Sequence, residues 1–174
     1  MKVELVKYPT DEDYLWAKQC ALGTVGKETD KVPTPEWKHR ILEARHSPIR
    51  DLMFRFVLRD IPYFVSVHMV RHHIGVNWYV QSHRNDRQDK YDRNAARQDA
   101  PVTVRMSINA EELMVIANKR LCNLASPETR ALVRMICDEV LKVCPEFEGL
   151  LVPFCKFHGG VCHEMYPCNR NKDG

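Results

Sequence analysis

Apolar and polar residues alternate along the segment DLMFRFVLRD, residues 51–60. On an extended chain, this alternation places the apolar side chains on one face and two arginines on the other. The apolar face consists of Leu52, Phe54, Phe56 and Leu58, and the polar face carries Arg55 and Arg59. A period of two residues predicts a β-strand with one buried face. The segment VELVKY, residues 3–8, predicts a shorter strand.

Other segments have features typical of helices, and most of them begin with a residue type that favours a helix N-terminus. Threonine, asparagine and serine accept hydrogen bonds from the first free backbone N–H groups of a helix, and proline suits the first turn. The N-cap candidates are Thr10, Thr34, Asn109 and Ser126, and the first-turn prolines are Pro35, Pro62 and Pro127. The predicted helices cover residues 11–20, 35–44, 62–73, 109–125 and 126–144. The last of them has apolar residues at helical spacing, at Leu132, Met135, Ile136 and Val140.

Together these elements predict an α/β domain of the α+β kind, with helices dominating its second half. The polar and charged segment 85–101 predicts a loop or an exposed helix. Because no repeat or low-complexity linker divides the chain, we expect a single domain over residues 1–174, ending in a Cys/His-rich tail at residues 153–174.

The composition is that of a soluble globular protein. The chain has 174 residues, of which 44% are hydrophobic and 28% charged, and this length suits one compact domain with a real core. The net charge of +3 is mild. It argues against a protein that coats a nucleic-acid polymer, but it does not oppose binding of a small anion.

The sequence also limits the expected location of the protein. No stretch approaches the roughly 18 consecutive apolar residues of a transmembrane helix, and the start MKVELVKYPT lacks the apolar run of a signal peptide. The seven cysteines are an odd number in a chain without a secretion signal. We therefore expect reduced thiols, a cytoplasmic location and no membrane partner.

A crowded basic stretch, VRHHIGVNWYVQSHRND at residues 70–86, is a candidate binding site. On the predicted helix, His68, Arg71 and His72 would lie on one face at positions i, i+3 and i+4, and a Ser-x-Arg sequence follows. From this spacing, the arginine, the two imidazoles and the Ser-x-Arg sequence are expected to converge on a single volume. Guanidinium forks bind phosphate and the carbonyl edges of a pyrimidine, so a ligand with those groups fits there. The alternative is an exposed basic helix end, which the helix dipole favours.

The order of several short segments resembles the flavin-dependent thymidylate synthases. HSPIRDLMFRF, IPYFVSVHMVRHH and SHR occur in the order of that family's H-x-S/T-x-x-E-H, Q-x-x-R-H-R and S-x-R segments. ARQDAP, INAEELM, NKR and ASPETR are similar to its A-R-x-x-L-P, V-N-A, N-L-R and A-Q-x-E-I-R segments. The resemblance covers roughly residues 1–147.

This resemblance implies a reaction, a set of ligands and an assembly. Members of the family are homotetramers with active sites shared between subunits, and they bind FAD and dUMP. NADPH supplies a hydride to the flavin, methylenetetrahydrofolate supplies the carbon, and dTMP is released. No protein nucleophile adds to the pyrimidine. Arginines polarise the uracil and hold the phosphate, which is catalysis by positioned charge.

The resemblance also implies roles for individual residues. Arg71 and Arg120 are the expected catalytic residues. The expected nucleotide-binding residues are His68, Arg71, Ser82, Arg84, Arg97 and Arg120, with Ser82 and Arg84 reaching the phosphate of a neighbouring subunit's site. The expected flavin contacts are Ser47, His72, His73 and Asn109. Taken singly, each of these residues is also explained as a surface arginine or a capping asparagine.

The chain departs from the family pattern mainly on the flavin and folate side. His73 stands where the family has arginine, His68 stands where it has glutamine, and Arg45 and Arg50-Asp51 replace a histidine and a Glu-His pair. These departures bear on FAD binding and thymidylate synthesis more than on nucleotide binding. Two alternatives remain open: a relative that modifies another pyrimidine nucleotide or uses another one-carbon donor, and a non-catalytic nucleotide-binding module.

Two further expectations concern charge and assembly. Histidines change charge near neutral pH whereas glutamine and arginine do not, so His68 and His73 predict that FAD affinity or flavin reduction depends on pH between about 6 and 8. Trp78 and Tyr79 are expected to be an exposed aromatic pair at an interface between copies of the chain. A tetramer is the expected assembly.

The tail contains a second group of chemically active residues, in CKFHGGVCHEMYPC at residues 155–168. Cys155, His158, Cys162 and Cys168 have the ligand types of a tetrahedral zinc site. Their spacing does not match the usual pairs of zinc ligands, however. Buried structural thiols, or a cysteine pair near the subunit interface, are the main interpretation, and zinc is the alternative.

Overall fold

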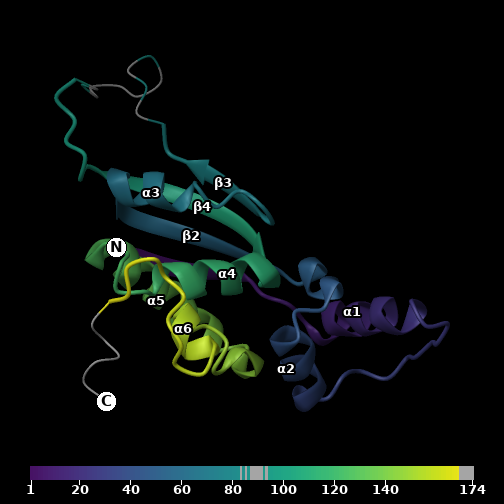
Figure 1. The fold of residues 1–174 in the computed structure, drawn as a ribbon. Helices are drawn as coiled ribbons and strands as arrows, with labels where there is room; N and C mark the ends of the chain where they lie inside the picture. Colours follow the sequence, from purple (N-terminus) through teal and green to yellow (C-terminus); the bar gives the residue numbers. More distant parts are fainter. Residues whose placement is uncertain (83, 85, 87–91, 93, 169–174) are drawn as a thin grey trace.

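A four-stranded antiparallel sheet organises the molecule, as the computed structural model shows (Figure 1). The model describes residues 1–82, 84, 86, 92 and 94–168. The strands are β1 (Lys2–Lys7), β2 (Met53–Pro62), β3 (Val76–Val80) and β4 (Pro101–Asn109), in the order β1-β2-β4-β3. The helices are α1 (Asp11–Gly23), α2 (Pro35–Glu43), α3 (Tyr63–Met69), α4 (Ala110–Arg120), α5 (Pro127–Leu141) and α6 (Phe154–Phe157), with short 3-10 helices η1 (Ser47–Asp51) and η2 (Pro145–Phe147).

The alternation in β2 places its side chains as predicted. Phe54, Phe56 and Leu58 are fully buried, whereas Arg55 and Arg59 are exposed on the opposite face. The strand begins two residues later than predicted, because Leu52 N–H donates to Ile49 O and closes η1 just before it. Lying between β1 and β4, β2 forms the centre of the core.

Two strands were not predicted. β3 and β4 pair with each other in antiparallel register, from Val76 opposite Ile108 to Val80 opposite Val104. The buried residues of β4 alternate, at Val102, Val104, Met106 and Ile108, and this period of two was present in the sequence. The described residues of segment 85–101 form turns and irregular chain rather than a helix before β4 begins at Pro101. Residues 83, 85, 87–91 and 93 lie outside the described residues.

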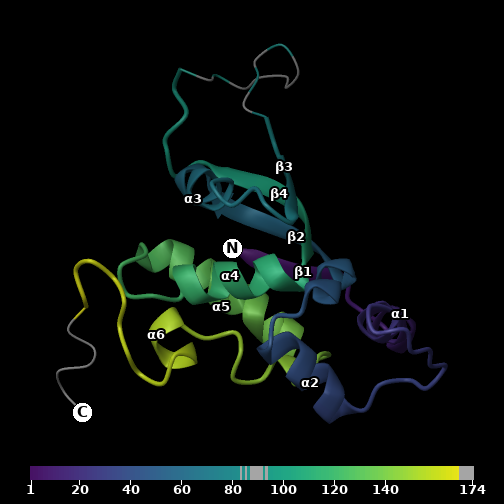
Figure 2. The same cartoon turned by 45° about the vertical axis from the view of Figure 1, so that its right-hand side comes forward.

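The predicted helix N-termini are correct. Thr10, Thr34, Asn109 and Ser126 each accept a backbone N–H with the side chain at the start of a helix. The predicted C-termini of two helices extend too far, since α4 ends at Arg120 and α5 at Leu141. Helices α4 and α5 lie against one face of the sheet, and α6 lies beyond α4 on the side away from the sheet (Figures 1 and 2). None of the helices among the described residues could span a membrane by length and apolarity.

Candidate functional site

The helix α3 ends before the basic residues that follow it. Helix 62–73 was predicted, but α3 ends at Met69, so the prediction that His72 continues a helical face is wrong. Two hydrogen bonds from residues beyond the turn hold the chain here. Trp78 Nε1–H donates to His72 O at 2.7 Å, and the backbone N–H of Asn109 donates to Gly75 O at 2.9 Å. Arg71, His72 and His73 therefore lie in the turn between α3 and β3.

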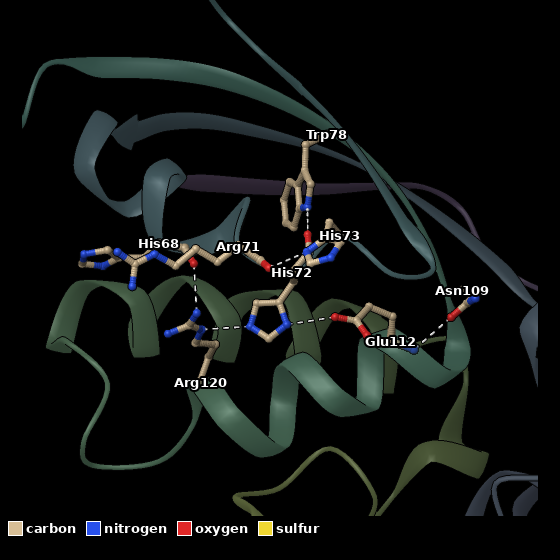
Figure 3. Close-up of polar contacts among 8 residues, drawn as sticks. All are labelled: His68, Arg71, His72, His73, Trp78, Asn109, Glu112 and Arg120. Atoms are coloured by element: carbon tan, nitrogen blue, oxygen red, sulfur yellow. Dashed lines mark hydrogen bonds and ion pairs between the residues drawn. The ribbon is translucent and has the colours of Figure 1, made fainter.

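The turn nevertheless brings His72 to Arg120, at the C-terminal end of α4 (Figure 3). Arg120 Nε lies 3.0 Å from His72 Nε2, and Arg120 Nη2 donates to His68 O at 3.0 Å. The other ring nitrogen of His72, Nδ1, lies 2.9 Å from Glu112 Oε1. The side chains of His72 and Glu112 are only 13% and 10% exposed, so this cluster is largely shielded from water.

Positive charge gathers around Arg120. Burial lowers the pKa of its guanidinium below the ordinary arginine value, and the positive charge of Arg71 lowers it further. Arg71 is exposed, and within the described part of the chain no carboxylate forms an ion pair with it. Arg120 and His72 line a cavity of about 260 Å³ together with Lys119, Cys122 and Glu164. One guanidinium group in the cavity wall, with the positive charge of Arg71 close by, favours an anionic or carbonyl-rich ligand.

A second group of predicted residues lies elsewhere. Ser82, Arg84 and Arg97 line a different cavity of about 620 Å³. Each arginine is exposed and binds an aspartate two residues further along the chain. Arg84 donates from Nε and Nη2 to Asp86 at 3.0 and 2.6 Å, and Arg97 donates likewise to Asp99 at 2.8 and 3.1 Å. These hydrogen bonds hold the pKa values of both aspartates below the ordinary range.

The expectation that all these groups converge on one volume is therefore wrong for a single chain. His72 and Arg120 line one cavity, whereas Ser82, Arg84 and Arg97 line another, and the two lining sets share no residue. The separation arises because α3 stops early: the turn carries His72 toward α4, while β3 carries the chain away to Ser82.

Sequence comparison finds no match among protein-family models or curated proteins, but solved structures resemble this chain closely in fold. Thymidylate synthase X (ThyX) from Helicobacter pylori, with FAD and dUMP, matches with a TM-score of 0.70 and 16% identity, over 87% of this chain and 99% of that one. A second structure of that flavin-dependent enzyme, complexed with FAD and dUMP, has a TM-score of 0.66, 15% identity and coverages of 83% and 98%. The UMP/dUMP methylase PolB from Streptomyces cacaoi, bound with 5-Br dUMP, has a TM-score of 0.64, 14% identity and coverages of 83% and 92%.

The chain has the ThyX-like fold. This bears out the predicted α/β architecture and the fold that the sequence resemblance implied. At these identities the likeness establishes the arrangement of the chain, and the roles of individual side chains follow from their own geometry.

The predicted flavin contacts of this ThyX-like chain differ in accessibility. Ser47 and His73 are exposed, and His73 Nδ1 lies 3.0 Å from Arg71 O. Asn109 is 9% exposed, and its Oδ1 accepts the backbone N–H of Glu112 at 2.9 Å. The exposed imidazole and hydroxyl fit hydrogen bonding to a cofactor at the surface. Asn109 has one side-chain oxygen already engaged in the helix cap, so its direct contact with flavin stays a prediction.

His68 has a different environment from that of His73. Its Nδ1 lies 3.2 Å from Thr129 Oγ1, and its ring packs edge-on against Phe64 with centroids 5.8 Å apart. His68 is half-buried and takes part in binding Arg120 through its backbone carbonyl. The pH dependence of flavin binding that was expected from His68 and His73 stays a prediction.

The zinc alternative for the tail has no preformed ligand group among the described residues and stays a prediction. Cys155, His158, Cys162 and Cys168 all lie within the described residues, which contain no group of three or more His, Cys, Asp or Glu able to hold a metal ion. The ring of His158 packs against Phe154 instead, with centroids 4.1 Å apart. All seven cysteines lie within the described residues and are free thiols in this structure, and Cys155, Cys162 and Cys168 are partly exposed rather than buried.

The last part of the chain, from Val152 into the tail, also contacts α4 close to the candidate site. Asn118 Nδ2 donates to Val152 O at 2.6 Å, and Lys119 Nζ pairs with Glu164 at 3.2 Å. Because Glu164 lines the same cavity as Arg120, the segment beyond the family resemblance adds a carboxylate to the wall of that cavity.

Sequence reasoning missed Glu112 and misjudged Trp78. Glu112 follows the N-cap Asn109 by three residues, a spacing typical of a capping box, and nothing in the local pattern indicates a contact with His72. Trp78 was expected to be exposed with Tyr79, but it is half-buried and packs against the core, whereas Tyr79 is 64% exposed. Only the long-range pairing of β3 with β4 places these side chains.

Proposed function

We propose that the protein is a cytoplasmic, flavin-dependent enzyme that methylates dUMP to dTMP, with methylenetetrahydrofolate and NADPH as co-substrates. One observation carries the proposal. In a chain with the ThyX-like fold, the half-buried Arg120 is oriented by hydrogen bonds to His72 and to His68 O. The positive charge of Arg71 lies close enough to act on it. The three solved structures compared above contain FAD and dUMP, or a brominated dUMP.

The proposed chemistry of the site follows from fixed donors. Arg120 would donate hydrogen bonds to the carbonyl edge of the uracil and stabilise the negative charge that develops on it during transfer. Arg71 would add a second positive charge near the same ring. Bound FAD would supply the hydride that reduces the transferred carbon. The surface groups Ser47 and His73, together with His72 and Asn109, are the proposed flavin contacts.

The phosphate is proposed to bind the second group of residues on a neighbouring copy of the chain. Ser82, Arg84 and Arg97 line a cavity that Arg120 does not share. A nucleotide that used both arginine sets would therefore bridge two copies. This arrangement supports a homo-oligomer with shared sites, and a tetramer is the assembly we propose.

In a second candidate function, the ligand is still a pyrimidine nucleotide, but it is not dUMP or it is bound without reaction. The Streptomyces cacaoi structure with this fold is a UMP/dUMP methylase, and the histidines at positions 68 and 73 mark the side on which this chain departs from the family. The protein would then methylate another pyrimidine nucleotide, or bind one without catalysis.

A visible absorption spectrum and a thermal-shift assay separate these functions. The proposed enzyme binds FAD with a flavin spectrum that dUMP perturbs, and it forms dTMP when all substrates are present. The relative with another substrate binds FAD but responds more strongly to UMP or another pyrimidine nucleotide. A non-catalytic module is stabilised by dUMP and not by FAD. Absence of both FAD and nucleotide binding contradicts all three functions.

Arginine variants test the proposed nucleotide contacts. Replacing Arg120 or Arg84 with alanine should weaken dUMP binding by roughly 10- to 100-fold, the effect of losing a hydrogen bond to a charged group. Arg134→Ala removes an exposed arginine of α5 and serves as the control, with dUMP affinity unchanged within about twofold. Wild-type affinity in both Arg84→Ala and Arg120→Ala contradicts the proposed site.

A further inference from the structure

The hydrogen bonds among Arg120, His72 and Glu112 have only one consistent direction. A guanidinium group donates and cannot accept, so Arg120 Nε–H donates to His72 Nε2 at 3.0 Å and this ring nitrogen carries no proton. The neutral imidazole then carries its proton on Nδ1, which donates to Glu112 Oε1 at 2.9 Å. Glu112 accepts as a carboxylate. The chain therefore runs from cation to carboxylate through a neutral imidazole (Figure 3).

The position of Glu112 in α4 explains why its carboxylate can reach His72. It is the third residue of the helix, where a glutamate commonly bonds back to the N–H of the N-cap residue. Here the N-cap residue is Asn109, and its N–H already donates to Gly75 O at 2.9 Å. Asn109 Oδ1 in turn accepts the N–H of Glu112. The backbone of Glu112 is thus fixed while its side chain extends to the imidazole.

The burial of these groups makes the connection energetically important. A carboxylate that is 10% exposed is costly unless it has a charged or hydrogen-bonding partner. His72 is the only described residue with a hydrogen bond or ion pair to the Glu112 carboxylate. Trp78 donates to the carbonyl of His72 at 2.7 Å, which holds the backbone from which the imidazole extends.

Two contacts then set the orientation of the Arg120 guanidinium. Nε is directed at His72 and one Nη2 hydrogen at His68 O, which leaves the remaining N–H groups for a ligand. Because an unrestrained arginine loses considerable conformational entropy when it binds, a guanidinium held in place in advance binds more tightly. The positive charge of Arg71 repels the guanidinium of Arg120. The hydrogen bonds to His72 and His68 O oppose this repulsion.

We propose that Glu112 is a positioning residue, which fixes the Nδ1–H tautomer of His72 and through it holds Arg120 in the orientation that binds the pyrimidine. The inference rests on the proposed function in one respect, namely that Arg120 contacts the nucleotide. Glu112 itself touches neither nucleotide nor cofactor in this proposal. His72 acts on the nucleotide through Arg120, which adds to its proposed contact with the flavin.

Glu112→Ala and Glu111→Ala form a matched pair that tests the inference. Both variants remove one carboxylate from the first turn of α4, but Glu111 pairs with Arg50 and not with His72. Glu112→Ala should weaken dUMP binding by roughly tenfold, and Glu111→Ala should leave it within about twofold. Glu112→Gln retains an acceptor for His72 and should recover most of the affinity. Equal weakening by the two alanine variants overturns the proposal.

Two readouts separate positioning from general damage to the fold. In an Arg120→Ala background, Glu112→Ala should have no further effect on dUMP affinity, because there is no guanidinium left to orient. An undiminished effect in that background overturns the proposal. By ¹⁵N NMR without nucleotide, wild type should show the Nδ1–H tautomer of His72 and slow solvent exchange of Arg120 Nε–H. Glu112→Ala should lose both, and Glu111→Ala should keep both.

The NMR readout also distinguishes failure of this inference from failure of the proposed function. A wild-type protein that binds no dUMP contradicts the proposed function, while the tautomer and the exchange rate still report on the connection between Glu112 and Arg120. If both NMR signals are unchanged in Glu112→Ala, the positioning role is overturned whether or not dUMP binds. Circular dichroism establishes that each variant is folded, and Glu112→Gln supplies the comparison if Glu112→Ala is not.

Discussion

Gly75 and Asn109 meet at two points, once through the backbone and once through the side chain. The N–H of Asn109 donates to Gly75 O at 2.9 Å. A Cβ atom at position 75 would lie 2.7 Å from Asn109 Nδ2 and 2.9 Å from its Oδ1. Gly75 also has a φ of +72°, which favours glycine. The turn that carries His72 and the cap that begins α4 are therefore packed directly against each other.

Gly75→Ala should destabilise the protein more than a left-handed conformation alone explains. The strained backbone costs about 1–2 kcal/mol, and displacing Asn109 from the helix cap costs about 1 kcal/mol more. Gly26→Ala is the control, because Gly26 has a φ of +69° and no atom within 4 Å of the added Cβ. Urea unfolding measures the two losses of free energy. If both variants lose the same free energy of unfolding, the Asn109 side chain moves aside without destabilising the protein.

Asp99→Asn should strengthen dUMP binding by roughly two- to fivefold, the scale of releasing an exposed ion pair. Asp99 now occupies both donors of Arg97 that a phosphate would use. Isothermal titration calorimetry measures the affinity. Asp92→Asn makes the same charge change in the same segment and should have a smaller effect. Weaker or unchanged binding in Asp99→Asn would argue that Arg97 does not contact phosphate.

Cys137 and Cys144 should resist thiol reagents in the folded protein. Both are buried, and burial raises the pKa of each thiol to about 12. At pH 8, iodoacetamide followed by mass spectrometry should find these two cysteines unmodified until urea is added, whereas Cys20 and Cys122 are partly exposed and should react. Fast labelling of Cys137 in the native protein would contradict the buried position of the thiol.

The raised pKa values of these two thiols should make the free energy of unfolding depend on alkaline pH. Their pKa values are higher in the folded state than the usual 9.0, so the folded protein retains protons that the unfolded chain loses. The contribution of these thiols to the free energy of unfolding is therefore fully present below about pH 9, and it is lost as the pH rises toward 12. Urea unfolding at several alkaline pH values measures this slope. A double variant with alanine at both positions should show a shallower slope than wild type.

Tyr79→Glu should dissociate the proposed tetramer. Tyr79 is 64% exposed and lies opposite Arg105 on the sheet face that faces away from α4 and α5. A buried charge at an interface is costly without a partner. Light scattering should give the mass of four 20.3 kDa chains for wild type and a lower mass for the variant. Tyr166→Glu, at a tyrosine that is 78% exposed in the tail, is the control. A monomeric wild type contradicts the proposed assembly.

Much of the local structure was predictable because it depends on neighbours within a few residues. The alternation of Phe54 and Phe56 with Arg55 predicts a strand with one buried face, and the N-caps at Thr10 and Ser126 were correct because a side-chain oxygen reaches only the N–H groups just ahead of it. The alternation of apolar residues in β4 is equally regular, but β4 was not predicted. The arginines of the proposed nucleotide site were identified by family resemblance, which orders short segments without placing them in space.

The site itself depends on contacts that no local pattern specifies. Local helical spacing predicted that His72 would share a helix face with His68, but α3 ends at Met69, and Trp78 and Asn109 donate hydrogen bonds to the backbone of the turn that follows. Arg120 is 48 residues from His72 in sequence, and the two meet because the turn after α3 packs against α4. Residue types and helix starts are fixed by chemistry along the chain. The pairing of His72 with Arg120 and Glu112 is decided only by the tertiary structure, because it requires distant segments to pack together and exclude water.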